Sequence, residues 1–223
     1  TGAHAIFGRT PLRDLTLPAL GPLLEKSGVL SLGPRGVNFF CTTMRFPEPP
    51  AIVADRLRLD LGTCPSEDYV MWGVTSRVDS HATDPHRLKS AALALIEGFA
   101  GDFDTLVRAS DVDDTITVPI RAAPKLTRWK PSRVTLLGDA IHAMPPVGAN
   151  GANTALRDAQ VLARCLSRGD AIEDAVGSYE NEMRAYSRRL VRRGTRMMSA
   201  ITSPSPLARG LLRATLRVAA WLA

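Results

Sequence analysis

Residues 133–166, RVTLLGDAIHAMPPVGANGANTALRDAQVLARCL, change from an apolar run to a loop and then to a helical pattern. The run Val134–Leu137 is apolar apart from one threonine, and continuous apolar strands are usually covered on both faces of a sheet. Asp139 follows this run, at the carboxyl end of the expected strand, where open α/β sheets place their ligands. From Gly151 to Leu166 apolar residues recur at helical spacing. The stretch therefore predicts a strand, a ligand-binding loop and a helix.

The loop has the composition of an anion site built from backbone groups. Pro145 and Pro146 stiffen it and remove two N–H donors. Gly148, Asn150 and Gly151 follow directly before the expected helix, and small residues there leave backbone N–H groups uncovered. The start of a helix adds a partial positive charge of roughly half a unit. We therefore expect an anionic group to bind at this helix start.

Two anions fit such a site: a phosphate, or the negatively charged edge of a reduced flavin. A nucleotide P-loop carries Lys and then Ser or Thr after its last glycine. Ala152 and Asn153 occupy those places here, which argues against a nucleoside triphosphate.

The string G-D-A-I-H-A-M-P-P-x-G-x-N-G-x-N-x-A-x-x-D-A-x-x-L, which begins at Gly138, resembles the second FAD fingerprint of para-hydroxybenzoate hydroxylase-like flavin monooxygenases. The segment Ala123–Trp129 also resembles the family's approach to this fingerprint, and the resemblance is sharp over residues 116–168. It implies that Asp139 hydrogen-bonds the ribityl hydroxyls of FAD. The flavin-binding residues that it implies are Gly138, Asp139, Pro146, Gly148, Asn150, Gly151, Ala152 and Asn153.

The resemblance implies an FAD-dependent monooxygenase that uses NAD(P)H and O₂ to hydroxylate an aromatic or polyketide-like small molecule. The cofactor carries this chemistry, so no catalytic side chain is assigned. Halogenases and prenyl reductases with a similar Gly-Asp segment are enzyme alternatives. A non-catalytic remnant or binding module that keeps the fold without FAD is an alternative of another class. The sequence contains neither G-x-G-x-x-G nor Asp-Gly, which the family uses to bind FAD, so we expect this chain alone to bind FAD weakly and to be inactive.

Several single residues have two interpretations. His142 could act as a general base near neutral pH, but the resemblance favours a packing and hydrogen-bonding role. Asp158 is expected to orient the loop or to pair with an arginine. Arg121 could meet a phenolate or carboxylate, or lie on the surface. The candidates for lining a substrate pocket are Phe40, Trp72 and Pro145, although an aromatic residue on a strand is more often part of a core.

The rest of the chain predicts an α+β fold with an antiparallel substrate-domain sheet. Residues 28–46 have the pattern of a hairpin, and residues 52–61 and 69–78 add further strand-like runs. A helix is expected after Asp84-Pro85, because apolar residues recur at helical spacing from Leu88 to Phe99, and a short strand is expected at residues 116–120.

Helices are expected at residues 172–195 and 206–223. The predicted parts are a substrate-binding-type domain at residues 1–120, the second half of an FAD-binding domain at 121–168 and a C-terminal helical segment at 169–223.

Composition and charge limit the remaining function classes. The net charge is +6, and nine arginines with no acidic residue lie between residues 184 and 223. We interpret this run as a solvated helix face rather than a site for nucleic acid or membrane, and expect the last helix to dock on the protein with Arg209, Arg213 and Arg217 outward. The three cysteines and four histidines have no ligand spacing, so we expect no metal site and a cytoplasmic protein with reduced thiols.

Overall fold

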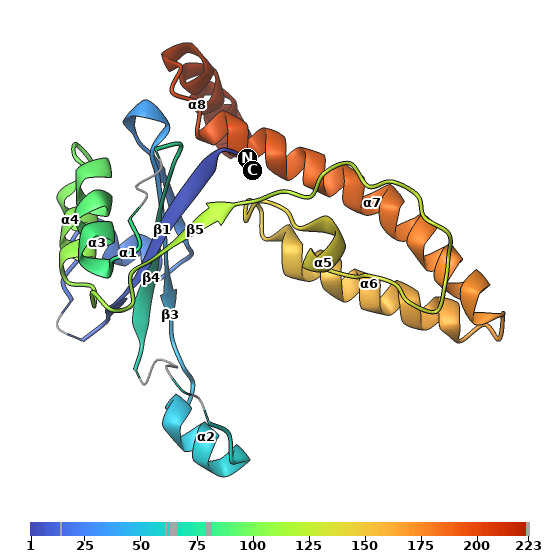
Figure 1. Ribbon diagram of the computed structural model, residues 1–223. Coiled ribbons are helices and arrows are strands. Elements are labelled where there is room, and N and C mark those ends of the chain that lie inside the picture. The colour runs from blue at the N-terminus through green and yellow to red at the C-terminus, as the bar shows by residue number, and fades with distance from the viewer. Residues whose placement is uncertain (14, 61, 63–66, 79–81, 222–223) are drawn as a thin grey trace. The chain divides into compact units, whose positions relative to one another are not determined.

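The computed structural model describes residues 1–13, 15–60, 62, 67–78 and 82–221. These residues form two compact units (Figure 1). One, called here the sheet unit, contains residues 3–119 and the chain from residue 201 onward. The other, called the helical unit, contains residues 1–2 and 120–200.

The sheet unit is built on a five-stranded sheet with the strand order β2-β3-β4-β1-β5. The β1–β4, β2–β3 and β3–β4 pairs are all antiparallel. The hairpin predicted at residues 28–46 is confirmed as β2 and β3, joined through a short 3₁₀ turn at Pro34–Gly36. The strands are β1 (Ala3–Pro11), β2 (Val29–Leu32), β3 (Asn38–Met44), β4 (Tyr69–Ser76) and β5 (Ile116–Ile120). The predicted α+β class with an antiparallel sheet is confirmed.

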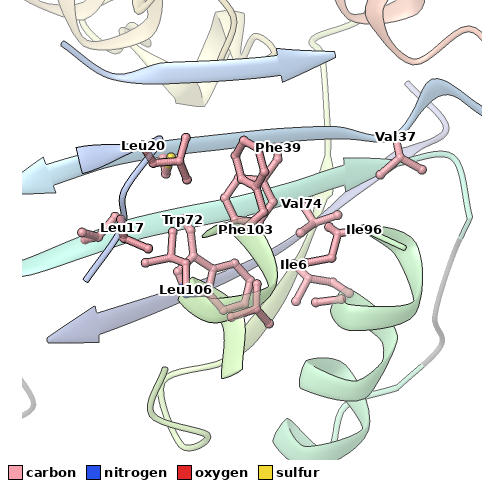
Figure 2. Packing of buried hydrophobic residues seen from close by; sticks show 14 of the residues in the cluster. Ile6, Leu17, Leu20, Val37, Phe39, Trp72, Val74, Ile96, Phe103 and Leu106 are labelled. Carbon is pink, nitrogen blue, oxygen red and sulfur yellow. The ribbon is translucent and has the colours of Figure 1, made fainter. Parts of the chain in front are cut away.

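One face of the sheet is covered by two helices, α3 (Pro85–Leu95) and α4 (Gly101–Arg108) (Figure 1). The predicted helix after Asp84 is confirmed, and its carboxylate accepts a hydrogen bond from the N–H of Arg87, 2.9 Å away, as a helix cap. Figure 2 shows the rings of Phe39 and Phe103 and the indole of Trp72 in the core between sheet and helices.

Trp72 lies in this core with no exposed surface. Its indole N–H donates to the hydroxyl of Thr10 over 3.2 Å, and that hydroxyl donates to the carbonyl of Leu106 over 2.8 Å. The indole lies directly against Gly8, where a Cβ would collide with the ring. Trp72 is therefore a core residue. The sequence analysis gave this as the alternative to lining a substrate pocket.

Two parts of this unit differ from the sequence interpretation. Residues 52–61 were expected to be strand-like, and this was wrong for the described part: α2 (Pro50–Leu57) is a helix, with proline at its start. The helix is followed by Arg58, its C-cap residue, whose φ of 52° is left-handed. Leu61 lies outside the described residues. The helix α4 was not identified from the sequence.

The helical unit contains α5 (Asp139–His142), α6 (Asn150–Leu166) and most of α7 (Ile172–Ile201). The predicted helices at residues 151–166 and 172–195 are confirmed, and α7 continues six residues further than expected. Val161 and Cys165 of α6 pack with Tyr179 and Met183 of α7 in a small apolar core.

The strand predicted at Val134–Leu137 is absent from this structure, so that prediction was wrong. The segment lies along α7 instead: the hydroxyl of Tyr179 donates to the carbonyl of Leu136 over 2.9 Å. Val134 is 75% exposed, whereas the sequence pattern implied cover on both faces. A strand needs a neighbour to hydrogen-bond, and none of the described strands pairs with this segment.

The last helix, α8 (Pro206–Trp221), lies in the sheet unit. The guanidinium of Arg209 donates to the carbonyl of Gly33, and that of Arg213 donates to the carbonyl of Leu32 over 2.9 Å. These two arginines therefore face the protein, and the expectation that they point outward was wrong. The carbonyls at the end of β2 and at Gly33 accept these hydrogen bonds. None of the helices in the described part of the chain has the apolar length that a membrane span requires.

Candidate functional site

A sharp turn at Gly138 leads into the loop that the sequence singled out. Gly138 has φ 60° and ψ −142°, a backbone conformation that residues with a Cβ atom rarely adopt. A Cβ here would also lie 3.2 Å from the Cβ of Ala155 on α6. The glycine therefore serves two needs, a left-handed turn and close approach to α6.

A fully buried carboxylate holds this turn in place. Oδ2 of Asp158 accepts a hydrogen bond from the N–H of Gly138 over 2.7 Å and lies 2.5 Å from Nε2 of His142. Oδ1 of the same side chain accepts a hydrogen bond from the hydroxyl of Tyr186. Asp158 thus joins α6, the Gly138 turn, α5 and α7 in one network.

Tyr186 is the member of this network that the sequence analysis missed. Burial raises the pKa of its hydroxyl, and the hydrogen bond to Asp158 raises it further. The guanidinium of Arg157 lies 4.1 Å from the centre of the Tyr186 ring. Tyr179, Met183 and Tyr186 recur at helical spacing on α7, and that spacing was the available signal that Tyr186 turns inward.

A second buried carboxylate, Glu180, holds the segment before the turn. Its Oε1 accepts hydrogen bonds from the indole N–H of Trp129 over 2.8 Å and from the hydroxyl of Thr135 over 2.9 Å. The guanidinium of Arg184 lies 3.7 Å from Oε2 and stacks over the Trp129 ring at 4.7 Å. Side chains of α7 therefore fix residues 129–136 without a sheet.

An open hollow of about 470 Å³ lies where the Gly138 turn meets the start of α6. Asp139 is the only charged residue of its lining. The lining residues are Asp139, Met144, Pro146, Ala149, Asn150, Gly151, Ala152 and Ala155. Five of the eight residues implied by the resemblance meet here: Asp139, Pro146, Asn150, Gly151 and Ala152.

The other three implied residues lie around this hollow rather than in its lining. Gly138 is buried in the turn. Gly148, with φ 78°, lines a groove on the neighbouring side of the loop. The side-chain amide of Asn153 donates to the carbonyl of Ala149 over 3.0 Å and so holds the start of the helix.

The start of α6 has the properties of an anion-binding helix terminus. Its N-cap residue, Ala149, is left-handed with φ 52°, and no side chain caps the first N–H groups. A Cβ on Gly151 would meet no atom within 4 Å, so space lies over this backbone. Uncovered amides beside one carboxylate suit a ligand with an anionic edge and hydroxyl donors, and an FAD molecule has both.

The substrate candidates lie in different parts of the fold. Phe40 is 37% exposed and points to the opposite side of β3 from the buried Phe39. Pro145 is buried, and it lies beside Gly194 of α7, where a Cβ would be 3.5 Å from the proline ring. Arg121 is exposed.

Comparisons with known proteins identify the family of this chain. A model of the FAD binding domain family matches residues 39–194. The chain is 39% identical over 220 residues to the dual O-methyltransferase/FAD-dependent monooxygenase elcB of Phaeosphaeria nodorum, covering 80% of this chain and 22% of that protein. It is 36% identical over 107 residues to the phenazine 1,6-dicarboxylic acid hydroxylase PhzS of Lysobacter antibioticus, covering 46% of this chain and 26% of that protein.

Solved structures show the same fold. A structure from Photorhabdus luminescens, described as an FAD-containing monooxygenase, matches with a TM-score of 0.71 and 28% identity, covering 90% of this chain and 54% of that one. HpxO of Klebsiella pneumoniae complexed with FAD and uric acid matches with a TM-score of 0.72 and 19% identity, covering 97% and 49%.

The chain thus spans about a quarter of these curated relatives and about half of these solved chains. The family model covers the described site from the Gly138 turn to α7. This chain belongs to the FAD-binding-domain family of FAD-dependent aromatic hydroxylases and monooxygenases.

Proposed function

We propose that this chain supplies the flavin-ring side of the FAD site in a monooxygenase that hydroxylates a small aromatic or polyketide-like molecule. The observation that carries this proposal is the hollow lined by both Asp139 and the uncapped start of α6. It combines a hydrogen-bond acceptor with backbone donors, as a flavin and its ribityl chain require.

Each lining group would have a separate role toward FAD. The carboxylate of Asp139 would accept hydrogen bonds from ribityl hydroxyls. The first N–H groups of α6 would face the N1–C2=O edge, and Gly151 would leave room for the ring to approach. Pro146 and Asn150 would border the ring.

The overall reaction that we propose converts NAD(P)H, one proton, O₂ and a substrate R–H into NAD(P)⁺, water and R–OH. Bound FAD supplies the oxygen chemistry. The residues of this chain hold and orient the ring, and their fixed dipoles stabilise its negative charge.

The substrate class is supported by the relatives' own ligands. PhzS acts on a phenazine dicarboxylic acid, and HpxO was solved with uric acid. In this chain Phe40 is the aromatic candidate with a surface that a substrate could touch, since Trp72 is fully buried. We propose a small-molecule substrate and no nucleic acid.

The test uses the complete protein that contains this chain. We expect it to purify with FAD and, with NAD(P)H and a substrate, to incorporate one atom of ¹⁸O₂ into the product. The variant Asp139→Ala should lose flavin, whereas Asp170→Ala, which removes an exposed carboxylate outside the site in the same unit, should not. A folded protein that neither contains nor binds FAD would overturn the proposal and support a non-catalytic remnant.

A further inference from the structure

The helical unit has a second concave site beside the hollow, an open groove of about 970 Å³ between the loop at Val147–Asn150 and the second half of α7. Its lining contains five arginines and no acidic residue. We call this site the arginine groove. Its arginines are Arg188, Arg189, Arg192, Arg193 and Arg196.

The five guanidinium groups share one helix face. Their spacing follows the helical period, and the span from Arg188 to Arg196 corresponds to about 12 Å along the helix axis. Like charges four residues apart on a helix repel each other. An anion bound between the five guanidinium groups would offset this repulsion and stabilise the helix.

Other arginines of the same unit are neutralised by partners. Arg164 donates to Glu182 over 2.6 Å, and Arg184 lies 3.7 Å from the buried Glu180. In the part of the chain that the structure describes, none of the five arginines in the arginine groove makes an ion pair or a side-chain hydrogen bond. Their positive charge is therefore available to a ligand.

The arginine groove adjoins the loop at Met144–Asn150, which we call the flavin loop because the proposed FAD site lies beside it. Asn150 lines both the groove and the hollow, so the two sites lie on either side of the same loop. α7 passes beside this loop at Gly194, where a Cβ would lie 3.5 Å from the ring of Pro145. Ala185 and Ala200 add small side chains to the groove lining, which leaves room for a ligand longer than a single ion.

We infer that the arginine groove binds the phosphate groups of the reductant and selects NADPH over NADH; this rests on the proposed function. Guanidinium forks match phosphate oxygens in geometry. NADPH carries one phosphate monoester more than NADH, about 1.5 to 2 further negative charges, and so uses more of the five cations. A reductant must also bind beside the flavin, and this groove borders the flavin loop.

The experiment titrates the complete FAD-loaded protein with NADP⁺ and with NAD⁺ by calorimetry. Wild type is compared with Arg189→Gln/Arg193→Gln, which changes two residues that line the groove alone. The matched control is Arg133→Gln/Arg168→Gln, which removes the same charge from exposed positions of the same unit. We expect the groove variant to bind NADP⁺ about tenfold more weakly or worse, with a much smaller change for NAD⁺. Flavin content and melting temperature should stay unchanged in both variants.

Equal NADP⁺ affinity in wild type and the groove variant would overturn the inference, as would equal losses in the groove variant and the control. Equal binding of NADP⁺ and NAD⁺ by wild type would overturn the selection of NADPH. If vesicles of phosphatidylserine bind wild type and not the groove variant while NADP⁺ affinity is unchanged, the groove serves a membrane surface and the inference is wrong. A wild-type protein without FAD contradicts the proposed function. NADP⁺ titration of that flavin-free protein and of its variants still measures whether the arginine groove binds phosphate.

Discussion

His142 and Asp158 form a pair without solvent exposure, with Nε2 of the imidazole 2.5 Å from Oδ2 of the carboxylate. The other ring nitrogen, Nδ1, has no hydrogen-bond partner among the described residues. Because the same Oδ2 also accepts from the N–H of Gly138, the pair acts on the backbone of the turn. The arrangement makes His142 a part of the loop's support.

Replacing Asp158 should loosen the whole turn. In Asp158→Asn the buried acceptor of Gly138 and Tyr186 loses its charge, and we expect a loss of about 2–3 kcal/mol in unfolding free energy together with weaker FAD binding. Tyr186→Phe removes one hydrogen bond only and should cost about 1 kcal/mol. Urea denaturation and flavin titration measure the two effects. Equal costs for both variants would contradict the central role of Asp158.

Bulk at Gly151 should remove the flavin and not the fold. A Cβ here meets no atom within 4 Å and φ is not positive, so Gly151→Val fits the protein but fills the hollow. We expect an unchanged melting temperature and loss of bound FAD, measured by absorbance. Gly21→Val, at a position that is also free of neighbours within 4 Å, is the control. Full flavin content in Gly151→Val would show that the ring does not approach this backbone.

His142→Ala should affect stability more than turnover. The side chain is fully buried, so its removal leaves a cavity and takes away one of the two partners of Oδ2 of Asp158, with a cost of about 2–4 kcal/mol. Turnover per bound flavin should fall much less than in Asp139→Ala. Stopped turnover in a folded, flavin-loaded His142→Ala would mean that this histidine transfers a proton.

The contact between Gly8 and Trp72 should be sensitive to a single methyl group. An alanine at position 8 would place its Cβ within the van der Waals radius of the indole, and we expect a loss of about 1–3 kcal/mol on denaturation. Gly101→Ala is the control in the same unit, because a Cβ there meets nothing within 4 Å. A neutral Gly8→Ala would show that the ring can shift freely.

Stability should fall in alkali partly through Cys41. Burial raises the pKa of this thiol from 9.0 to about 11. A raised pKa means that the stabilising preference for the neutral thiol is complete below pH 9 and is lost as pH rises towards 11. Between these values wild type should lose about 2–3 kcal/mol more than Cys41→Ala. Denaturation at several pH values measures both slopes, and parallel slopes would refute the effect.

The loop and the start of α6 could be predicted from the sequence because their residues are neighbours in the chain. Asp139, Pro146 and Gly151 line one hollow since a short loop connects them. The hairpin of β2 and β3 was predictable for the same reason, since turn residues separate two β-rich runs.

Contacts between residues that are far apart in the sequence could not be predicted from the sequence pattern. Tyr186 reaches Asp158 from 28 residues away, and the arginine groove exists only because α7 passes beside the loop at Pro145. An apolar run also does not show whether a neighbouring strand is present, and Val134–Leu137 was mispredicted for that reason.

The exposed run Val134–Leu137 has a consequence for the handling of this chain. Val134, Leu136 and Leu137 are 75%, 45% and 42% exposed, in a segment that is neither helix nor strand. Exposed apolar side chains gathered in one segment form a surface on which further copies of the chain can associate. Preparations of this polypeptide alone should therefore self-associate as the protein concentration rises. A charged residue at position 134 should raise the concentration at which self-association begins.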